Sequence, residues 1–187
     1  MNDTPDQKPI TIRAARPSDA AALNAYVRAI YTEGTGMITR PGEFRASTLR
    51  QRFWLARKGV NPDETCLLAF EDDTIVGMLE CWTDKRQRVR HSTTIAMSVH
   101  AGFRKRGIGK KLLLHFADWV QKHARLERIE LHVHADNLAA LALYRSIGFV
   151  LEGTRRGVIR YEDGTVTDDH IMAFWPKNDK MTPPRGH

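Results

Sequence analysis

The stretch IAMSVHAGFRKRGIGKKLLLHFADWV, residues 95–120, decides the fold because it joins a strand to a long helix through a basic loop. Apolar residues over 93–99 predict the strand. Beyond the loop, apolar residues recur at helical spacing and predict an amphipathic helix over 107–123. The residues expected on its core face are Ile108, Leu112, Phe116 and Val120.

Strand patterns flank this stretch on both sides. Alternating or short apolar runs between turn residues predict six further strands, and Asp163-Gly164 is the expected turn of a final hairpin. One strand, at 74–82, is apolar on both faces except at Glu80, which places it inside the sheet. The six further strands are expected at residues 10–14, 65–70, 74–82, 128–134, 149–156 and 166–175.

Three more helices are expected between the strands. One opens at residues 17–19, and another covers 137–147. The third begins at Ser47 and ends at Gly59. Its inward face is expected to carry Leu49, Phe53 and Ala56. A strand–helix–strand order implies parallel neighbours and a right-handed crossover, so the pattern predicts an α/β mixed sheet covered by helices.

Composition indicates one globular domain. The chain has 187 residues, 42% of them hydrophobic and 27% charged, which suffices for a single core. We expect a flexible arm at 1–9, the domain at 10–175 and a flexible tail at 176–187. No apolar run approaches the roughly 20 residues that span a bilayer, and the polar start does not resemble a signal peptide. These features favour a cytoplasmic protein with no membrane partner.

The two cysteines, Cys66 and Cys81, both lie in apolar runs. Such positions suit buried thiols in a reducing compartment, although a disulfide between neighbouring strands stays open. Their spacing matches no metal site. His132 and His134 form a His-x-His pair that could ligate a metal, but no third ligand is evident in the sequence, and we expect no metal.

The formal net charge is +7. A nucleic acid, an anionic membrane surface or a polyanionic small ligand could each balance it. The basic residues gather in two clusters, at 85–90 and at 104–111. The position of these clusters in the fold, and not the net charge, must therefore decide which of the three kinds of partner the protein binds.

The second cluster coincides with the start of the predicted helix. A helix N-terminus exposes unpaired N–H groups and carries about half a positive charge. Gly107 and Gly109 allow the backbone to approach a phosphate closely, and five cations occur within 104–111. A diphosphate could therefore be held by backbone donors as well as by side-chain charge. A helix start on a solvated basic surface would look similar, and neither G-x-x-x-x-G-K-[ST] nor G-x-G-x-x-G is present.

Two segments carry a family resemblance. The run IAMSVHAGFRKRGIGKKLL resembles the acetyl-coenzyme A (acetyl-CoA) signature of the GNAT N-acetyltransferases, R/Q-x-x-G-x-G/A after a strand. The later run DNLAALALYRSIGF is similar to the second GNAT signature, N-x-x-A-x-x-L-Y-x-x-x-G-F. The ending of the chain is most similar to branches that acetylate amino acids or other small amines. The resemblance implies the GNAT fold, a single mixed, mostly antiparallel sheet of six or seven strands with a parallel central pair and about four helices.

The resemblance also implies a cofactor site. Backbone groups of residues 97–99 would contact the pantetheine arm, and residues 104–110 would bind the diphosphate. Asn137 would hydrogen-bond the cofactor, and Tyr144 would lie beside the sulfur. Asn137 and Tyr144 are seven residues apart and share a helix face; an N-cap and a core aromatic are their alternative interpretations. The full set is Met97, Ser98, Val99, Arg104, Lys105, Arg106, Gly107, Ile108, Gly109, Lys110, Asn137 and Tyr144.

Acetyl transfer to an amine requires a base. An alkylammonium ion with a pKa of about 10.4 must lose a proton before it attacks the thioester. GNAT enzymes often place an acidic residue on the strand before the phosphate loop, where this chain has Thr93 and Thr94. His132 occupies the position of the glutamate of the ribosomal-protein acetyltransferases, and Glu80 is a second candidate. A polar strand face for His132 and an ion pair for Glu80 are the non-catalytic alternatives. Tyr144 is the candidate acid for the leaving thiolate.

The sequence thus predicts an acetyl-CoA-dependent N-acetyltransferase acting on the primary amine of a small molecule. The catalytic candidates are Tyr144, His132 and Glu80. Acetylation of a protein N-terminus, and a non-catalytic basic module that binds CoA or nucleic acid, are the alternatives. We expect no nucleic-acid partner, and a homodimer stays open. The loop at 31–44 and the hairpin at 155–165 are expected to border the acceptor pocket.

Overall fold

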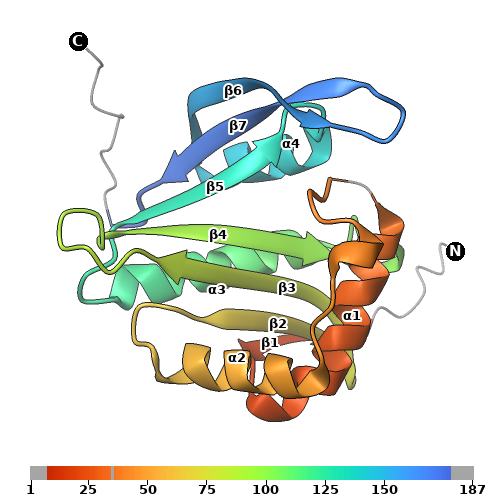
Figure 1. Ribbon diagram of the computed structural model, residues 1–187. Coiled ribbons are helices and arrows are strands. Elements are labelled where there is room, and N and C mark those ends of the chain that lie inside the picture. Colours follow the sequence, from red (N-terminus) through yellow and green to blue (C-terminus); the bar gives the residue numbers. More distant parts are fainter. Residues whose placement is uncertain (1–7, 35, 178–187) are drawn as a thin grey trace, which may run out of the picture.

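The computed structural model describes residues 8–34 and 36–177 (Figure 1). The predicted arm at 1–9 and tail at 176–187 fall mostly outside the described residues. The strands are β1 (Ile10–Ala14), β2 (Cys66–Glu71), β3 (Thr74–Thr83), β4 (Ser92–Val99), β5 (Arg128–His134), β6 (Val150–Arg160) and β7 (Val166–Phe174). The α-helices of the described part are α1 (Ala20–Glu33), α2 (Thr48–Val60), α3 (Ile108–Lys122) and α4 (Leu138–Ile147).

The seven strands of the described residues form one sheet in the order β1-β2-β3-β4-β5-β7-β6. β4 and β5 are parallel and every other neighbouring pair is antiparallel. This confirms the mixed sheet with a parallel central pair. The strands before and after α3, β4 and β5, are parallel neighbours in the sheet. The strands before and after α4, β5 and β6, are not neighbours, because β7 lies between them. The tight hairpin keeps β6 and β7 paired, and β7 takes the ladder position beside β5.

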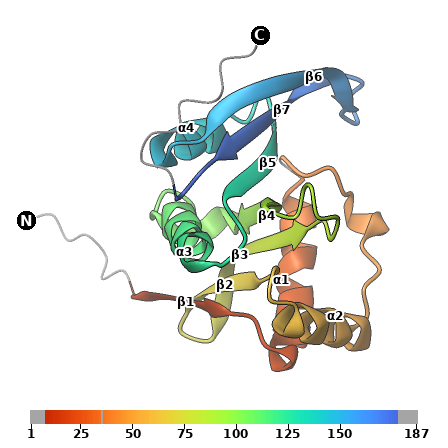
Figure 2. The ribbon, with the colours of Figure 1, turned by 90° about the vertical axis from the view of Figure 1, so that its left-hand side faces the viewer.

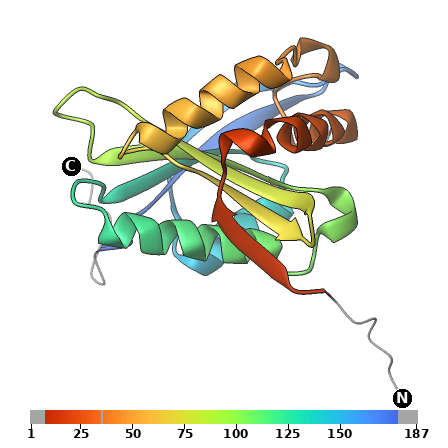
Figure 3. The ribbon, with the colours of Figure 1, turned by 90° about the horizontal axis from the view of Figure 1, so that it is seen from below.

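The helices cover the sheet unequally. α1 and α2 lie on one face, and α3 and α4 lie on the other (Figure 3). On the α1 side the described helices stop short of β5, β7 and β6, so this part of the sheet has no helical cover (Figure 2). The core face predicted for α3 is confirmed, since its four expected residues are each no more than 1% exposed. We call the face that carries α1 and α2 the upper face.

The inward face predicted for α2 is wrong. Leu49 and Phe53 are 60% and 68% exposed, whereas Leu55 and Lys58 are buried. Lys58 pairs with Glu64 at 2.9 Å and donates a hydrogen bond to a carbonyl of β3, so its ammonium group can stay inside. Helical spacing of apolar residues cannot reveal that a lysine is satisfied in the interior. Ser47 caps the helix as predicted, but the helix continues through Gly59.

β4 and β5 separate towards their carboxyl ends. They pair only from Ser92 with Arg128 to Ile95 with Leu131, although both strands continue for several residues (Figure 1). Because the N–H of His100 bonds to β3, alternation turns the backbone groups of Met97 and Val99 towards the gap. Except for the Val99 carbonyl, which accepts from Arg104, these backbone groups have no partner among the described residues.

Candidate active site

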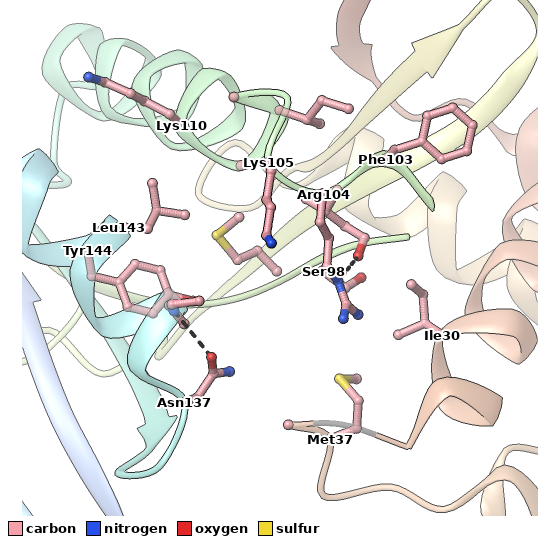
Figure 4. A pocket seen from close by; sticks show the side chains of 18 of the residues that line it. Ile30, Met37, Ser98, Phe103, Arg104, Lys105, Lys110, Asn137, Leu143 and Tyr144 are labelled. Atoms are coloured by element: carbon pink, nitrogen blue, oxygen red, sulfur yellow. Dashed lines mark hydrogen bonds between the residues drawn. The ribbon is translucent and has the colours of Figure 1, made fainter. Parts of the chain in front are cut away.

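A cavity of about 910 Å³ lies where β4 and β5 separate (Figure 4). The start of α3, one face of α4 and the segment after α1 complete its walls. Of the predicted cofactor set, all but Arg106 line it. These lining residues are Met97, Ser98, Val99, Arg104, Lys105, Gly107, Ile108, Gly109, Lys110, Asn137 and Tyr144. Residues from two distant signatures are thus brought together around one space.

The loop before α3 presents backbone donors to this cavity. Lys105 and Gly107 have φ values of 62° and 74°, so two left-handed residues shape the turn. The first N–H of the helix to find an intrahelical acceptor is that of Lys111, which bonds to Gly107 at 3.0 Å. The N–H groups of residues 105–110 have no acceptor within the described part of the chain. Such a concave run of amides beside a helix start is suited to an anion.

Gly109 sets the distance between α3 and its neighbours. A Cβ built there would lie 3.0 Å from Leu143 Cδ2 and 3.2 Å from Met97 Cε. The missing side chain therefore lets Leu143 of α4 and Met97 of β4 pack closely against the start of α3. The free amides, together with the cations of Arg104, Lys105 and Lys110, fit a diphosphate. The apolar wall beyond them fits a long arm of the same ligand.

The two arginines of the loop differ in their surroundings. Arg104 donates from Nε to the Val99 carbonyl at 3.0 Å and pairs with Glu33 at the end of α1. Arg106 pairs instead with Glu71 at 2.5 Å, and its side chain is 18% exposed. The Arg106 guanidinium is therefore engaged outside the cavity, and only its backbone N–H can contribute to an anion site.

Asn137 and Tyr144 both project from α4 towards the cavity (Figure 4). Asn137 caps the helix, because its side-chain oxygen accepts from the Ala140 N–H at 3.2 Å. Tyr144 is 7% exposed, and its hydroxyl has no hydrogen-bond partner among the described residues. Burial raises the pKa of Tyr144 to about 12. At neutral pH the hydroxyl is therefore protonated and available as a donor.

The other two catalytic candidates lie outside the cavity lining, on the upper face beside the gap. Thr94 pairs with Glu130, so alternation puts Ala96 and His132 on the same face. His132 is the first residue of β5 beyond its last pair with β4, and Glu80 stands opposite Ala96 on β3. A carboxylate and an imidazole therefore flank a small alanine where the strands part. Burial raises the pKa of the Glu80 carboxyl.

His132 has an elaborate set of partners. Its Nδ1 lies 2.8 Å from Asp169 Oδ2, and its Nε2 lies 3.6 Å from Glu130 Oε1. Asp169 is 1% exposed and also accepts from Arg155 Nε at 2.8 Å and Nη2 at 2.5 Å. Desolvation opposes the charge of Asp169, but the bonds from His132 and Arg155 outweigh it and lower the pKa of the carboxyl. Asp169 at 2.8 Å favours the tautomer with its proton on Nδ1, in which Nε2 is the hydrogen-bond acceptor.

The loop after α1 and the β6–β7 hairpin contact each other. Arg40 Nε lies 2.9 Å from Glu162 Oε1. The hairpin also brings Tyr161 to the cavity wall, where its hydroxyl donates to Asp136 at 2.9 Å. The upper face beside the gap is therefore bounded by two connections from distant parts of the chain.

Several lining residues were not identified from the sequence. Ile30, Met37 and Leu143 carry no polar signal, and their place in the wall follows from packing alone. Tyr161 lies just before the hairpin turn, where an aromatic side chain is unremarkable. Asp169, which lies outside the cavity lining, was not identified either. It stands in a polar run, so its burial shows only once its partners on two other strands are known.

The two basic clusters lie at opposite ends of the sheet. Residues 85–90 belong to the connection between β3 and β4, whereas 104–111 follow the far end of β4 (Figure 1). Only the second cluster adjoins the cavity. Within residues 8–34 and 36–177, no three metal-ligating side chains gather into a group that could hold an ion. In the same residues, every helix is too short or too polar to cross a membrane.

Comparison with known proteins agrees with this geometry. The family model described as "Acetyltransferase (GNAT) family" matches residues 25–149. The L-amino acid N-acetyltransferase AaaT of Escherichia coli is 30% identical over 121 residues, 64% of this chain and 74% of the relative. N-alpha-acetyltransferase 50 of Danio rerio is 28% identical over 109 residues, 58% of this chain and 64% of the relative.

Solved structures share the whole fold. A GNAT-family acetyltransferase from Streptococcus pneumoniae superposes with a TM-score of 0.86 at 28% identity, over 89% of this chain and 99% of the other. The yncA protein of Salmonella typhimurium, solved with its cofactor acetyl-CoA, gives a TM-score of 0.79 at 18% identity. That likeness covers 95% of this chain and 99% of the other.

Proposed function

The chain belongs to the GNAT family of N-acetyltransferases and uses acetyl-CoA, and we propose that its acceptor is the primary amine of a small molecule, an amino acid or a similar metabolite. The observation that carries the proposal is the juxtaposition at the gap between β4 and β5. Free amides and cations of the α3 start lie on one side of it, and His132, held by a buried carboxylate, lies beside it on the upper face.

Acetyl-CoA supplies an activated thioester, so the protein need not form a covalent intermediate. The N–H groups at the start of α3, with Lys105 and Lys110, would hold its diphosphate. The turned-out amides of Met97 and Val99 would bond the pantetheine arm as an added strand would. The apolar wall of the gap would exclude water from the reacting end.

The acceptor amine would approach from the upper face. His132 Nε2 is the group placed to take its proton, directly or through a water, because Nδ1 is held by Asp169. Asp169 would keep the ring in that tautomer, as a buried carboxylate does in hydrolytic triads. Tyr144, protonated in its buried site, would donate a proton to the departing thiolate.

Glu80 is the competing base. Its carboxylate has no hydrogen-bond partner among the described residues, and burial raises its pKa towards the range useful for proton transfer. It faces the same space from the other side of Ala96. The contacts favour His132, because a hydrogen bond fixes its ring and orients its free nitrogen.

Replacing His132 by Gln tests this assignment through pH. We expect kcat/KM for an amine acceptor to fall about 10- to 30-fold at pH 7, since a water can carry part of the proton transfer. The deficit should shrink as the pH approaches the pKa of the acceptor amine, because free amine then needs no base. Rates measured from pH 6.5 to 9.5 check this. A deficit of the same form in Glu80→Gln, with His132→Gln unaffected, would transfer the role to Glu80.

The acceptor class is tested by a thiol-release assay with acetyl-CoA. The panel would hold amino acids, polyamines, aminoglycosides and short peptides with free N-termini. The proposal expects turnover with one or more of the small amines to exceed that with peptides. Turnover confined to peptides would instead support acetylation of a protein N-terminus.

A further inference from the structure

The guanidinium of Arg155 has a free edge beside His132. Its Nε and Nη2 both bond to Asp169 Oδ2, and Nη2 lies 3.2 Å from His132 Nδ1. Nη1 has no hydrogen-bond partner among the described residues, and the side chain is half exposed. One edge of this arginine is thus fixed by a buried carboxylate, while the other faces outward.

The other arginines near this face are placed differently. Arg128 Nη1 donates to Ser92 and Glu130, both at 2.8 Å, and its Nη2 pairs with Glu152. Arg40 of the loop after α1 pairs with Glu162 through Nε, and no hydrogen bond joins it to His132. Among the described residues, Arg155 is therefore the guanidinium that contacts His132 and also keeps an Nη nitrogen for a ligand.

The Asp169 carboxylate itself is not fully satisfied. Its Oδ1 is buried and lacks a hydrogen-bond donor among the described residues. A buried oxygen of this kind requires an explanation, because leaving it unpaired is costly. A polar ligand, or a water held beneath it, would supply the missing donor.

We propose that Arg155, fixed by Asp169 beside His132, binds a carboxylate of the acceptor, so that the acceptor carries a carboxylate next to its amine. This inference rests on the proposed function and specifies its substrate class. Arg155 Nη2 lies 3.2 Å from His132 Nδ1, so the guanidinium and the imidazole are direct neighbours. An amine at the imidazole and a carboxylate at the free guanidinium edge would therefore belong to one small molecule, as in an α-amino acid.

The position of Arg155 also suits a ligand carboxylate. Arg155 extends from β6 across β7 to β5, on the part of the upper face that no described helix covers. Asp169 neutralises part of its charge but occupies only one of its two edges. A guanidinium can hold two carboxylates on separate edges, which a lysine cannot do with the same geometry.

The test compares matched acceptors that differ only at the carboxylate. L-leucine, L-phenylalanine and L-glutamine would each be assayed against the corresponding amino acid amide. The ratio of kcat/KM for acid to amide is expected to fall about 10- to 30-fold in Arg155→Gln, the worth of a charge-assisted hydrogen bond. Intrinsic amine reactivity cancels, because the same pair is compared in wild type and variant at one pH.

The control is Arg156→Gln, at the next residue of the same strand. Arg156 is exposed and makes no hydrogen bond or ion pair with described residues. Its acid-to-amide ratio should stay within about twofold of wild type. Arg155→Lys, which keeps the charge but loses the planar edge, should fall between wild type and Arg155→Gln, and it serves if Arg155→Gln fails to fold.

The outcomes separate the two claims. An unchanged ratio in Arg155→Gln, or a wild type that prefers the amides, would overturn the carboxylate subsite and leave a small-amine acetyltransferase. Turnover of peptides alone would overturn the proposed acceptor class and the subsite with it. A ratio that falls in Arg155→Gln and holds in Arg156→Gln would support the subsite.

Discussion

Gly107→Glu should abolish measurable binding of CoA, a loss of at least about 100-fold in affinity. Gly107 has φ of 74°, a left-handed conformation that costs a residue with a Cβ about 1–2 kcal/mol. The new carboxylate would also stand among the free amides of residues 105–110, where it would compete with the diphosphate for the same donors. Titration calorimetry of the variant with CoA measures the loss.

Two controls separate the causes of that loss. Gly164→Glu makes the same charge change at another left-handed glycine, with φ of 85° and open space around it, in the β6–β7 turn. CoA affinity should be nearly unchanged there. Gly107→Ala keeps the strain without the charge and should give an intermediate loss. Undiminished CoA binding in Gly107→Glu would remove the start of α3 from the cofactor site.

Tyr144→Phe should lower kcat about 100-fold while leaving affinity for CoA within about threefold of wild type. The change removes a hydroxyl that has no hydrogen-bond partner among the described residues, from a side chain that lines the cavity. The aromatic ring keeps its packing against Phe149. A general acid contributes roughly 10² to 10⁴ in rate. Steady-state kinetics and calorimetry on the same preparation provide the two readings.

The pH profile adds a second reading of Tyr144. Because burial raises its pKa to about 12, the hydroxyl keeps its proton throughout the range in which the protein is assayed. Wild-type kcat should therefore show no alkaline decline from this group below about pH 11. Equal losses of kcat and CoA affinity in Tyr144→Phe would show instead that the tyrosine only shapes the cavity.

Most of the fold could be predicted because local patterns agreed with the final packing. The apolar face of α3 predicts burial against the core, and the apolar β3 predicts a position inside the sheet. Both predictions are confirmed. The failures occurred where tertiary contacts decide. α2 turns a paired lysine inward in place of Phe53, and β7 takes the position beside β5 that the strand–helix–strand pattern assigned to β6.

The candidate site divides in the same way. The loop of free amides beside the cavity could be predicted because donors, glycines and cations lie within a few consecutive residues. The cluster of His132, Asp169 and Arg155 could not, because these residues come from three strands and meet only through the order β5-β7-β6. His132 was identified by its residue type and position, but the carboxylate that fixes it is visible only in three dimensions.

The central claim is that amides at the start of α3 hold the diphosphate of an acyl carrier. Calorimetry of the wild-type protein with CoA and with pantetheine, which lacks the diphosphate and nucleotide, tests it most directly. Saturable CoA binding at least about 100-fold tighter than that of pantetheine is the expected result, since charge-assisted bonds contribute about 1.5–3 kcal/mol each. Equal affinity for the two ligands, or no saturation with millimolar CoA, would contradict the claim.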